Sequence, residues 1–84
     1  MHYVYILQSK IDDELYVGST NDLRRRLAEH NDGKVKSTFP RRPYSLIYYE
    51  AYKAEYDARR RESALKKRGQ ARARLKERLS ASLQ

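Results

Sequence analysis

Tyr3-Val4-Tyr5-Ile6-Leu7 and Leu15-Tyr16-Val17-Gly18-Ser19 are the two stretches of sequence that decide the fold. Both are rich in β-branched and aromatic residues, which favour strands, and the first has no polar face, which predicts a strand buried on both sides. The polar residues 9–14 predict a connecting loop, so the simplest arrangement is an antiparallel hairpin. Tyr5 and Tyr16 then lie on adjacent strands.

A helix is predicted directly after the second strand. We expect it to begin near Asp22, with Thr20 or Asn21 offering a side-chain oxygen to its free N–H groups. The run Asn31-Asp32-Gly33 is typical of a helix end. The chain therefore turns from a hairpin into a short helix.

Two pairs of residues spaced four apart give this helix two distinct faces. Leu23 and Leu27 form the stripe that faces the core, whereas Arg26 and His30 lie on an adjoining face. The spacing predicts that the Arg26 and His30 side chains point to one place.

The remaining residues predict one loop, one strand and two helices. Residues 34–43 mix basic, hydroxyl and Pro residues and predict an extended loop that contacts a ligand, and residues 44–52 predict the third strand. A helix follows from Ala54 to about Arg68, Gly69 breaks it, and a basic helix covers about residues 70–83. We expect the following apolar helix residues to face the core: Ala58, Ala64, Leu65, Leu75, Leu79 and Leu83. The predicted class is α+β, a small three-stranded antiparallel sheet flanked by helices in the order β-β-α-β-α-α.

Length and composition predict one domain over residues 1–84, with its core at about residues 2–68. Without Cys, the chain can form neither a disulfide nor a thiolate zinc site. It has no 18-residue apolar run and no signal peptide pattern, which predicts a cytoplasmic protein without a membrane partner. The sequence gives no indication of oligomeric state, and a protein partner stays open.

The formal charge of +8 is confined to the second half of the chain, because residues 41–84 hold thirteen Lys and Arg against five Asp and Glu. A one-sided positive charge favours a polyanion, since each neutralised phosphate releases counterions. An anionic membrane is a poorer partner, because the basic segments lack an exposed apolar face rich in Trp and Phe. Nucleic acid is therefore the predicted partner.

Six residues invite a chemical interpretation, and each has an ordinary alternative. A tyrosine can simply fill the core with its hydroxyl in water, and a helical Arg or His is usually a solvated side chain. A Glu followed by a Lys four residues later is usually a helix ion pair. The six are Tyr5, Tyr16, Arg26, His30, Glu62 and Lys66.

Taken together, these residues resemble the GIY-YIG nuclease family over about residues 2–68. The resemblance rests on Tyr3-Val4-Tyr5, on Tyr16-Val17-Gly18 and on the downstream Arg26, His30 and Glu62. Arg-Arg-Pro at residues 41–43 and Glu-x-x-x-Lys-Lys at residues 62–67 are similar to small single-domain bacterial members, which are related to the nuclease module of the excision-repair C subunit.

The resemblance implies a metal-dependent endonuclease that hydrolyses DNA, with structure-selective cleavage and a link to repair or recombination as expectations. It implies that Tyr5 and Tyr16 line the active site together with Arg26 and His30. It also implies that Glu62 binds one divalent metal ion, Mg²⁺ or Mn²⁺.

This set is chemically coherent as a phosphodiesterase. Glu62 would hold a hard cation largely through waters and phosphate oxygens, and Arg26 would clamp a non-bridging phosphate oxygen. A tyrosine with an ordinary pKa of about 10 is a general base only if nearby positive charge lowers that pKa. Whether Tyr5 or Tyr16 is this base stays open, and His30 could assist the proton transfer or orient a phosphate.

Basic residues on both sides of the site are predicted to contact phosphates. They are Lys34, Lys36, Arg41, Arg42, Lys66, Lys67 and Arg68. No helix has the context of a base-reading helix, so weak sequence specificity is expected. The alternative functions are a non-catalytic nucleic-acid-binding module and a partner subunit of a larger nuclease, because no Asn follows Glu62, where many family members carry one.

Overall fold

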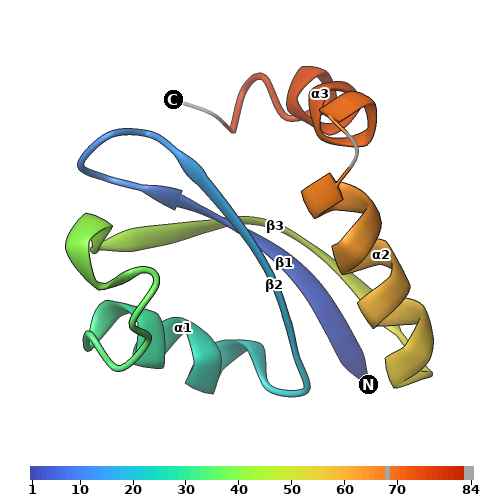
Figure 1. The fold of residues 1–84 in the computed structure, drawn as a ribbon, viewed down its shortest axis with the longest axis horizontal. Helices are drawn as coiled ribbons and strands as arrows, with labels where there is room; N and C mark the ends of the chain where they lie inside the picture. Colours follow the sequence, from blue (N-terminus) through green and yellow to red (C-terminus); the bar gives the residue numbers. More distant parts are fainter. Residues whose placement is uncertain (68, 83–84) are drawn as a thin grey trace.

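Three strands and three α-helices follow one another in the predicted order in the computed structural model, which describes residues 1–67 and 69–82 (Figure 1). Their bounds are β1 (His2–Ser9), β2 (Leu15–Thr20), α1 (Leu23–Asn31), β3 (Tyr44–Tyr52), α2 (Glu55–Lys67) and α3 (Gly69–Arg78), with a 3₁₀-helix, η1 (Phe39–Arg41), before β3. The predicted α+β class and three-stranded antiparallel sheet are confirmed. Arg68 and Leu83 lie outside the described residues.

The sheet has the order β2-β1-β3, so the strand with the most continuous apolar run is in the middle. Residues from Val4 to Ser9 are all buried, which confirms the prediction of a strand covered on both faces. Tyr5 pairs with Gly18 on β2 and with Tyr49 on β3. Because alternate side chains of a strand point to opposite faces, β1 contributes to two separate core layers.

Helices cover the two faces of the sheet separately (Figure 1). On one face, Tyr5 and Leu7 pack with Leu23 and Leu27 of α1, which confirms the predicted stripe. On the other face, strand residues pack against α2 and α3, and the buried residues of this layer are Val4, Ile6, Val17, Ala58, Leu65 and Leu75. Ala58 and Leu65 are buried as predicted, whereas Ala64 is half-buried.

The start of α1 differs from the prediction. Asp22, rather than Thr20 or Asn21, is the N-cap residue, and its Oδ1 accepts a hydrogen bond from the Arg25 backbone N–H at 3.0 Å. Asp22 adopts an extended backbone, which places its carboxylate over the free N–H groups of the first turn. Thr20 instead accepts from the Asp22 N–H at 3.1 Å and so shapes the turn before the helix.

Residues 34–43 are also not the extended loop that their composition predicted. The Val35 carbonyl accepts from the backbone N–H groups of Thr38 and Phe39, at 3.2 and 3.0 Å, and these bonds coil the segment before η1. Thr38 is completely buried as a result. Thr38 ties the loop to His30 of α1 at 2.7 Å, while most of the other side chains of the loop are exposed.

The break between the last two helices differs slightly from the prediction. α2 ends at Lys67, and Gly69, which was predicted to separate the helices, is the first residue of α3. Leu75 at the middle of α3 is buried, and Leu79 is partly buried against the same core layer. Among the described residues, no helix has the length and apolarity needed to cross a membrane.

We expect Leu65→Ala to lower the free energy of unfolding by about 3 kcal/mol, because it leaves a cavity at a side chain that is fully buried between α2 and the sheet. Urea unfolding measured by circular dichroism checks this value. Ile11→Ala, at an apolar residue that is 65% exposed, is the matched control and should change stability by less than about 0.5 kcal/mol. Equal losses in the two variants would contradict the assigned core.

Candidate active site

Tyr5 lies across Gly18 of the neighbouring strand, and this contact defines the position of the site. A Cβ atom added at Gly18 would collide with the Tyr5 hydroxyl oxygen and Cζ. The backbone of Gly18 is unstrained, so the glycine is required for space and not for an unusual conformation. The missing side chain therefore lets the Tyr5 phenol extend over β2 toward α1.

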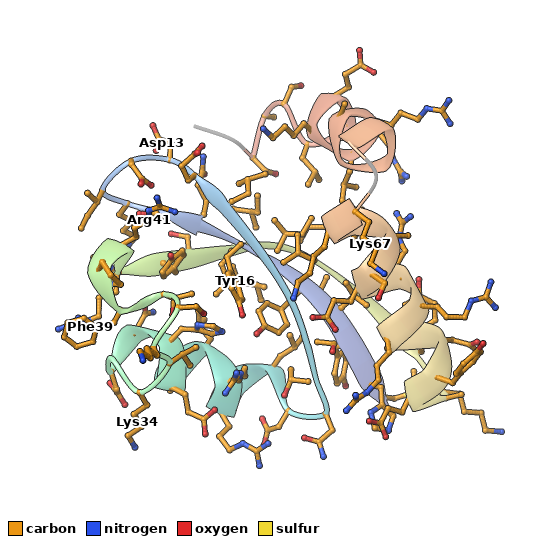
Figure 2. The ribbon with its side chains drawn as sticks, in the orientation of Figure 1. Asp13, Tyr16, Lys34, Phe39, Arg41 and Lys67 are labelled. Atoms are coloured by element: carbon orange, nitrogen blue, oxygen red, sulfur yellow. The ribbon has the colours of Figure 1, made fainter. Side chains whose placement is uncertain are left out.

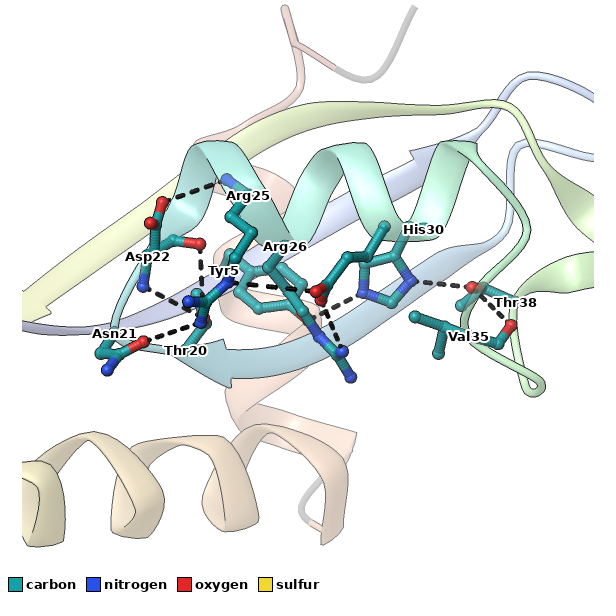
Figure 3. Close-up of polar contacts among 10 residues, drawn as sticks. Tyr5, Thr20, Asn21, Asp22, Arg25, Arg26, His30, Val35 and Thr38 are labelled. Carbon is teal, nitrogen blue, oxygen red and sulfur yellow. Dashed lines mark hydrogen bonds and ion pairs between the residues drawn. The ribbon is translucent and has the colours of Figure 1, made fainter.

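A buried chain of hydrogen bonds connects Tyr5 to α1 and to the loop after it (Figure 3). The Tyr5 hydroxyl lies 2.9 Å from His30 Nε2, and His30 Nδ1 lies 2.7 Å from Thr38 Oγ1. Arg26 lies beside Tyr5, and its guanidinium is one of the groups that set the Tyr5 pKa. Arg26 and His30 therefore meet at one tyrosine, as their spacing predicted.

The direction of this chain follows from its end at Val35. The Val35 carbonyl, which lies 3.4 Å from Thr38 Oγ1, can only accept, so the Thr38 hydroxyl donates to it and accepts from Nδ1 of His30. A neutral imidazole that donates from Nδ1 accepts at Nε2. Tyr5 donates to Nε2 of His30, and the His30 proton is on Nδ1, where it is donated to Thr38.

Burial keeps both members of the Tyr5–His30 pair neutral. Desolvation lowers the pKa of His30 to about 4, with a further decrease from the positive charge of Arg26. Desolvation also raises the pKa of Tyr5 to about 12, although the hydrogen bond from Arg26 opposes this change. The positive charge of Arg26 does act to lower the Tyr5 pKa, but burial outweighs it in the protein alone, so the condition for a ready general base is not met at Tyr5.

Arg26 itself is fixed at the edge of this layer. Its Nη1 donates to Glu29 Oε1 at 3.0 Å, and this hydrogen bond to the Glu29 carboxylate is the main reason that the pKa of Arg26 is raised. The guanidinium therefore stays charged and is half-buried between Tyr5 and the solvent.

Tyr16 completes a cluster of rings at the same place. Its ring centroid is 5.0 Å from that of His30 and 6.4 Å from that of Tyr5. Lys66 Nζ from α2 lies 5.9 Å from the Tyr16 centroid. These distances place Tyr16 between the Tyr5–His30 pair and the basic end of α2. Its side chain is half-buried.

Glu62 approaches the cluster from the opposite face of the sheet. Ser19 Oγ donates to its Oε1 at 2.6 Å, and Lys66 Nζ lies 2.8 Å from its Oε2. Partial burial acts to raise the pKa of Glu62, but the hydrogen bonds from Lys66 and Ser19 outweigh it, and the net pKa lies below the usual value. Glu62 is therefore ionised, and its charge acts on Tyr5.

The ordinary interpretation of Glu62 as the ion-pair partner of Lys66 describes a real contact, but it does not describe the whole environment. The hydrogen bond from Ser19 ties Glu62 to the edge of β2, beside Gly18. Within the residues that the structure describes, no three His, Cys, Asp or Glu side chains come close enough to hold a metal ion together. One carboxylate fits Mg²⁺ or Mn²⁺ only where waters and substrate phosphates complete the coordination shell.

A cleft of about 320 Å³ opens between the start of α1 and the start of α2. Its lining includes Arg26, Ser19 and Arg59. Because Arg26 contacts Tyr5 and Ser19 contacts Glu62, the cleft adjoins both halves of the site.

The predicted phosphate-binding residues that Figure 2 labels lie on either side of Tyr16. Lys34 and Arg41 come from the α1 side, and Lys67 comes from α2. Arg41 Nε pairs with Asp12 at 3.1 Å, and Arg42 lies over the Phe39 ring at 3.8 Å. The structure therefore brings Lys66 beside Glu62, and it holds Arg41 and Arg42 in local contacts away from that carboxylate.

Sequence reasoning missed two residues of the site. Ser19 follows Val17 on the same face of a strand, so the period of two could have indicated that it points toward α2. Thr38 has no comparable signal, because a hydroxyl in a Pro-rich loop reaches His30 only after the loop coils.

Known proteins resemble this chain in sequence and in fold. The family model described as the GIY-YIG catalytic domain matches residues 1–76. A UPF0213 protein of Staphylococcus haemolyticus is 46% identical over 66 residues, which cover 77% of this chain and 79% of that protein. A UPF0213 protein of Clostridium perfringens is 44% identical over 68 residues, covering 80% and 72%. The solution structure of a UPF0213 protein from Bacillus halodurans superposes with a TM-score of 0.55 at 38% identity and covers 95% of this chain and 82% of that one.

We expect acid to destabilise the protein through His30. The unfolded chain binds this proton near pH 6.5 and the folded protein only near pH 4, so the stabilisation is present above pH 6.5 and is lost as the pH falls toward 4. The loss between pH 7 and pH 4 should be about 3 kcal/mol from this residue. Urea unfolding across this range measures it. In His30→Gln the amide does not titrate, and its pH dependence should be smaller by that amount; identical profiles would contradict a buried neutral His30.

We expect Thr38→Val to reduce stability by about 1–3 kcal/mol, because it leaves the buried Nδ1–H of His30 without an acceptor. Thr38→Ser keeps the hydroxyl and should lose only about 1 kcal/mol with its methyl group. Urea unfolding and the nitrogen NMR shifts of the imidazole check this prediction. A His30 proton on Nε2 in the wild-type protein would contradict the direction of the hydrogen-bond chain.

Proposed function

Because the chain belongs to the GIY-YIG family, we propose that it is an endonuclease that hydrolyses phosphodiester bonds in DNA with one divalent metal ion, Mg²⁺ or Mn²⁺. The observation that carries this proposal is the meeting of an ionised carboxylate, Glu62, with a charged Arg26 and a neutral Tyr5–His30 pair at one edge of the sheet. Structure-selective cleavage and a role in repair or recombination are part of the proposal.

The hydrogen-bond chain supports Tyr5 as the group that receives a proton from the attacking water. Its own proton is already directed at the lone pair of His30 Nε2, 2.9 Å away. Tyr5 can accept one proton only while it gives another to His30, and burial and Arg26 hold the pKa of His30 at about 4 in the protein alone. The transfer therefore requires a bound phosphate, whose negative charge offsets that of Arg26 and raises the pKa of His30. Thr38 holds the His30 tautomer that makes this transfer possible.

Arg26 and Glu62 would stabilise the negative charge of the phosphate, one directly and the other through the metal ion. The planar guanidinium of Arg26 can donate to a non-bridging oxygen, where negative charge increases in the transition state. Glu62 would hold the metal ion, and a metal ion bound there supplies Lewis-acid stabilisation of the phosphate and the leaving oxygen. For this, Lys66 must move from Glu62 Oε2, and a substrate phosphate is a suitable new partner for its ammonium group.

The substrate follows from the charge distribution. The basic residues lie on both sides of Tyr16, so a polyanion longer than a single nucleotide can contact both groups (Figure 2). These contacts would be to phosphates, which position a nucleic acid without reading its bases. This supports selection by DNA shape over selection by sequence.

The experiment that tests the function compares the wild-type protein with Glu62→Ala on plasmid, branched and single-stranded DNA and on RNA. We expect cleavage in Mg²⁺ or Mn²⁺, no cleavage in EDTA, and a loss of more than about 100-fold in Glu62→Ala. Glu77→Ala, at an exposed carboxylate on α3, is the matched control and should cleave at the wild-type rate.

Other results would assign a different function. Salt-sensitive binding of DNA by the wild-type protein without cleavage in either metal would support the binding module or the partner subunit, and activity restored by a larger complex would identify the subunit. Preferential cleavage of RNA would change the substrate but keep the mechanism. Tyr5→Phe and Tyr16→Phe separate the two tyrosines, because only loss of the Tyr5 hydroxyl breaks the bond to His30.

A further inference from the structure

The outward face of α2 carries an aromatic ring that the core does not use. Tyr56 is 69% exposed, the most exposed large hydrophobic side chain among the described residues. It lines a shallow groove of about 460 Å³ that runs along the helix. The other lining residues are Arg59, Arg60, Ser63, Ala64 and Lys67. Core contacts of α2 come instead from Ala58 and Leu65 on its opposite face.

The chemistry of this groove is that of an aromatic ring surrounded by cations. The Arg60 guanidinium lies 5.7 Å from the Tyr56 ring centroid. Arg59 and Lys67 add two further positive charges, and no Asp or Glu lines the groove. Glu55 pairs with Arg59 across one turn at its border, at 2.7 Å. The groove thus complements a polyanion that also offers a flat apolar surface.

The groove adjoins the cleft of the candidate active site. Arg59 lines both of them. Glu62 lies three residues after Arg59 on the same helix, with its carboxylate turned toward Ser19 and β2. An extended chain that leaves the cleft over Arg59 would therefore run directly onto the face that carries Tyr56 and Arg60.

We propose that this groove binds an unpaired strand of nucleic acid, with one base stacked on Tyr56, a neighbouring phosphate on Arg60 and a phosphate further along the strand on Lys67. Stacking on an exposed ring requires a base whose flat face is free, which a continuous duplex does not offer along its length. Tyr56 and Lys67 are about 16 Å apart along the helix, which suits a short single-stranded segment. The inference deepens the proposed function, on which it rests for the cleavage step, by naming substrates with an unpaired strand next to the scissile bond.

Binding can be tested without cleavage by using Tyr56→Trp, because the chain contains no other Trp. In EDTA, a short oligothymidylate should quench the Trp fluorescence in a saturable manner. An abasic oligonucleotide of equal length has the same phosphates but nothing to stack and should quench weakly, as should a blunt duplex. An oligouridylate tests whether RNA is accepted as well as DNA.

Variants at the groove test the affinity. Fluorescence anisotropy of a labelled oligothymidylate should show at least about tenfold weaker binding for Tyr56→Ala and nearly unchanged binding for Tyr56→Phe, which keeps the ring. Tyr56→Ala removes no core contact and favours the helix, so folding is preserved. Lys67→Gln should weaken binding more than Lys10→Gln, a matched loss of charge in the exposed β1–β2 turn.

The outcomes separate this inference from the proposed function. Base-dependent quenching and oligonucleotide binding without cleavage would support the inference and contradict the proposed nuclease activity. Metal-dependent cleavage with no base-dependent quenching would overturn the inference alone. Equal quenching by the abasic oligonucleotide, by the blunt duplex or by polyglutamate would also overturn it, since charge alone would then explain the binding.

Discussion

The hydrogen bond between Tyr5 and His30 is the interaction on which the rest of the structure depends. It is buried between the central strand and α1, where an unpaired hydroxyl or imidazole would cost about 1–3 kcal/mol. The fold meets this requirement by placing Arg26 on one side and Thr38 on the other. Among the described residues, no buried side-chain polar atom lacks a partner. The sheet, the helix and the coiled loop are thus held in one arrangement.

The position of the site follows from the division of the core into two layers. β1 gives alternate residues to the α1 layer and to the α2–α3 layer, so chemistry placed in one layer is separated from the other by the sheet. At the edge strand β2 this separation ends. Gly18 lets the Tyr5 phenol reach that edge, and the adjacent Ser19 binds Glu62 from the other layer. The two halves of the site meet because Gly18 and Ser19 are neighbours on the edge strand β2.

Electrostatics divide the site into a neutral interior and a charged rim. Burial raises the pKa of Tyr5 and lowers the pKa of His30, and both effects favour the uncharged forms. Arg26, Glu62 and Lys66 keep their charges at the rim, where ion pairs compensate them before a substrate arrives. A phosphate can replace one partner in these pairs without exposing an uncompensated charge in the interior.

The strands, the order of the elements and the apolar stripe of α1 could be predicted from the sequence. These features depend on residue type and on the spacing of apolar residues that are near one another in the chain. The spacing of Arg26 and His30 likewise predicted that they converge. The sequence did not predict Asp22 as the cap, the coiling of residues 34–43 or the burial of Thr38, since these depend on backbone geometry and on contacts between distant segments. The pKa values of Tyr5 and His30 were decided by tertiary structure alone. Desolvation depends on what packs around a group, and no spacing along the chain contains that information.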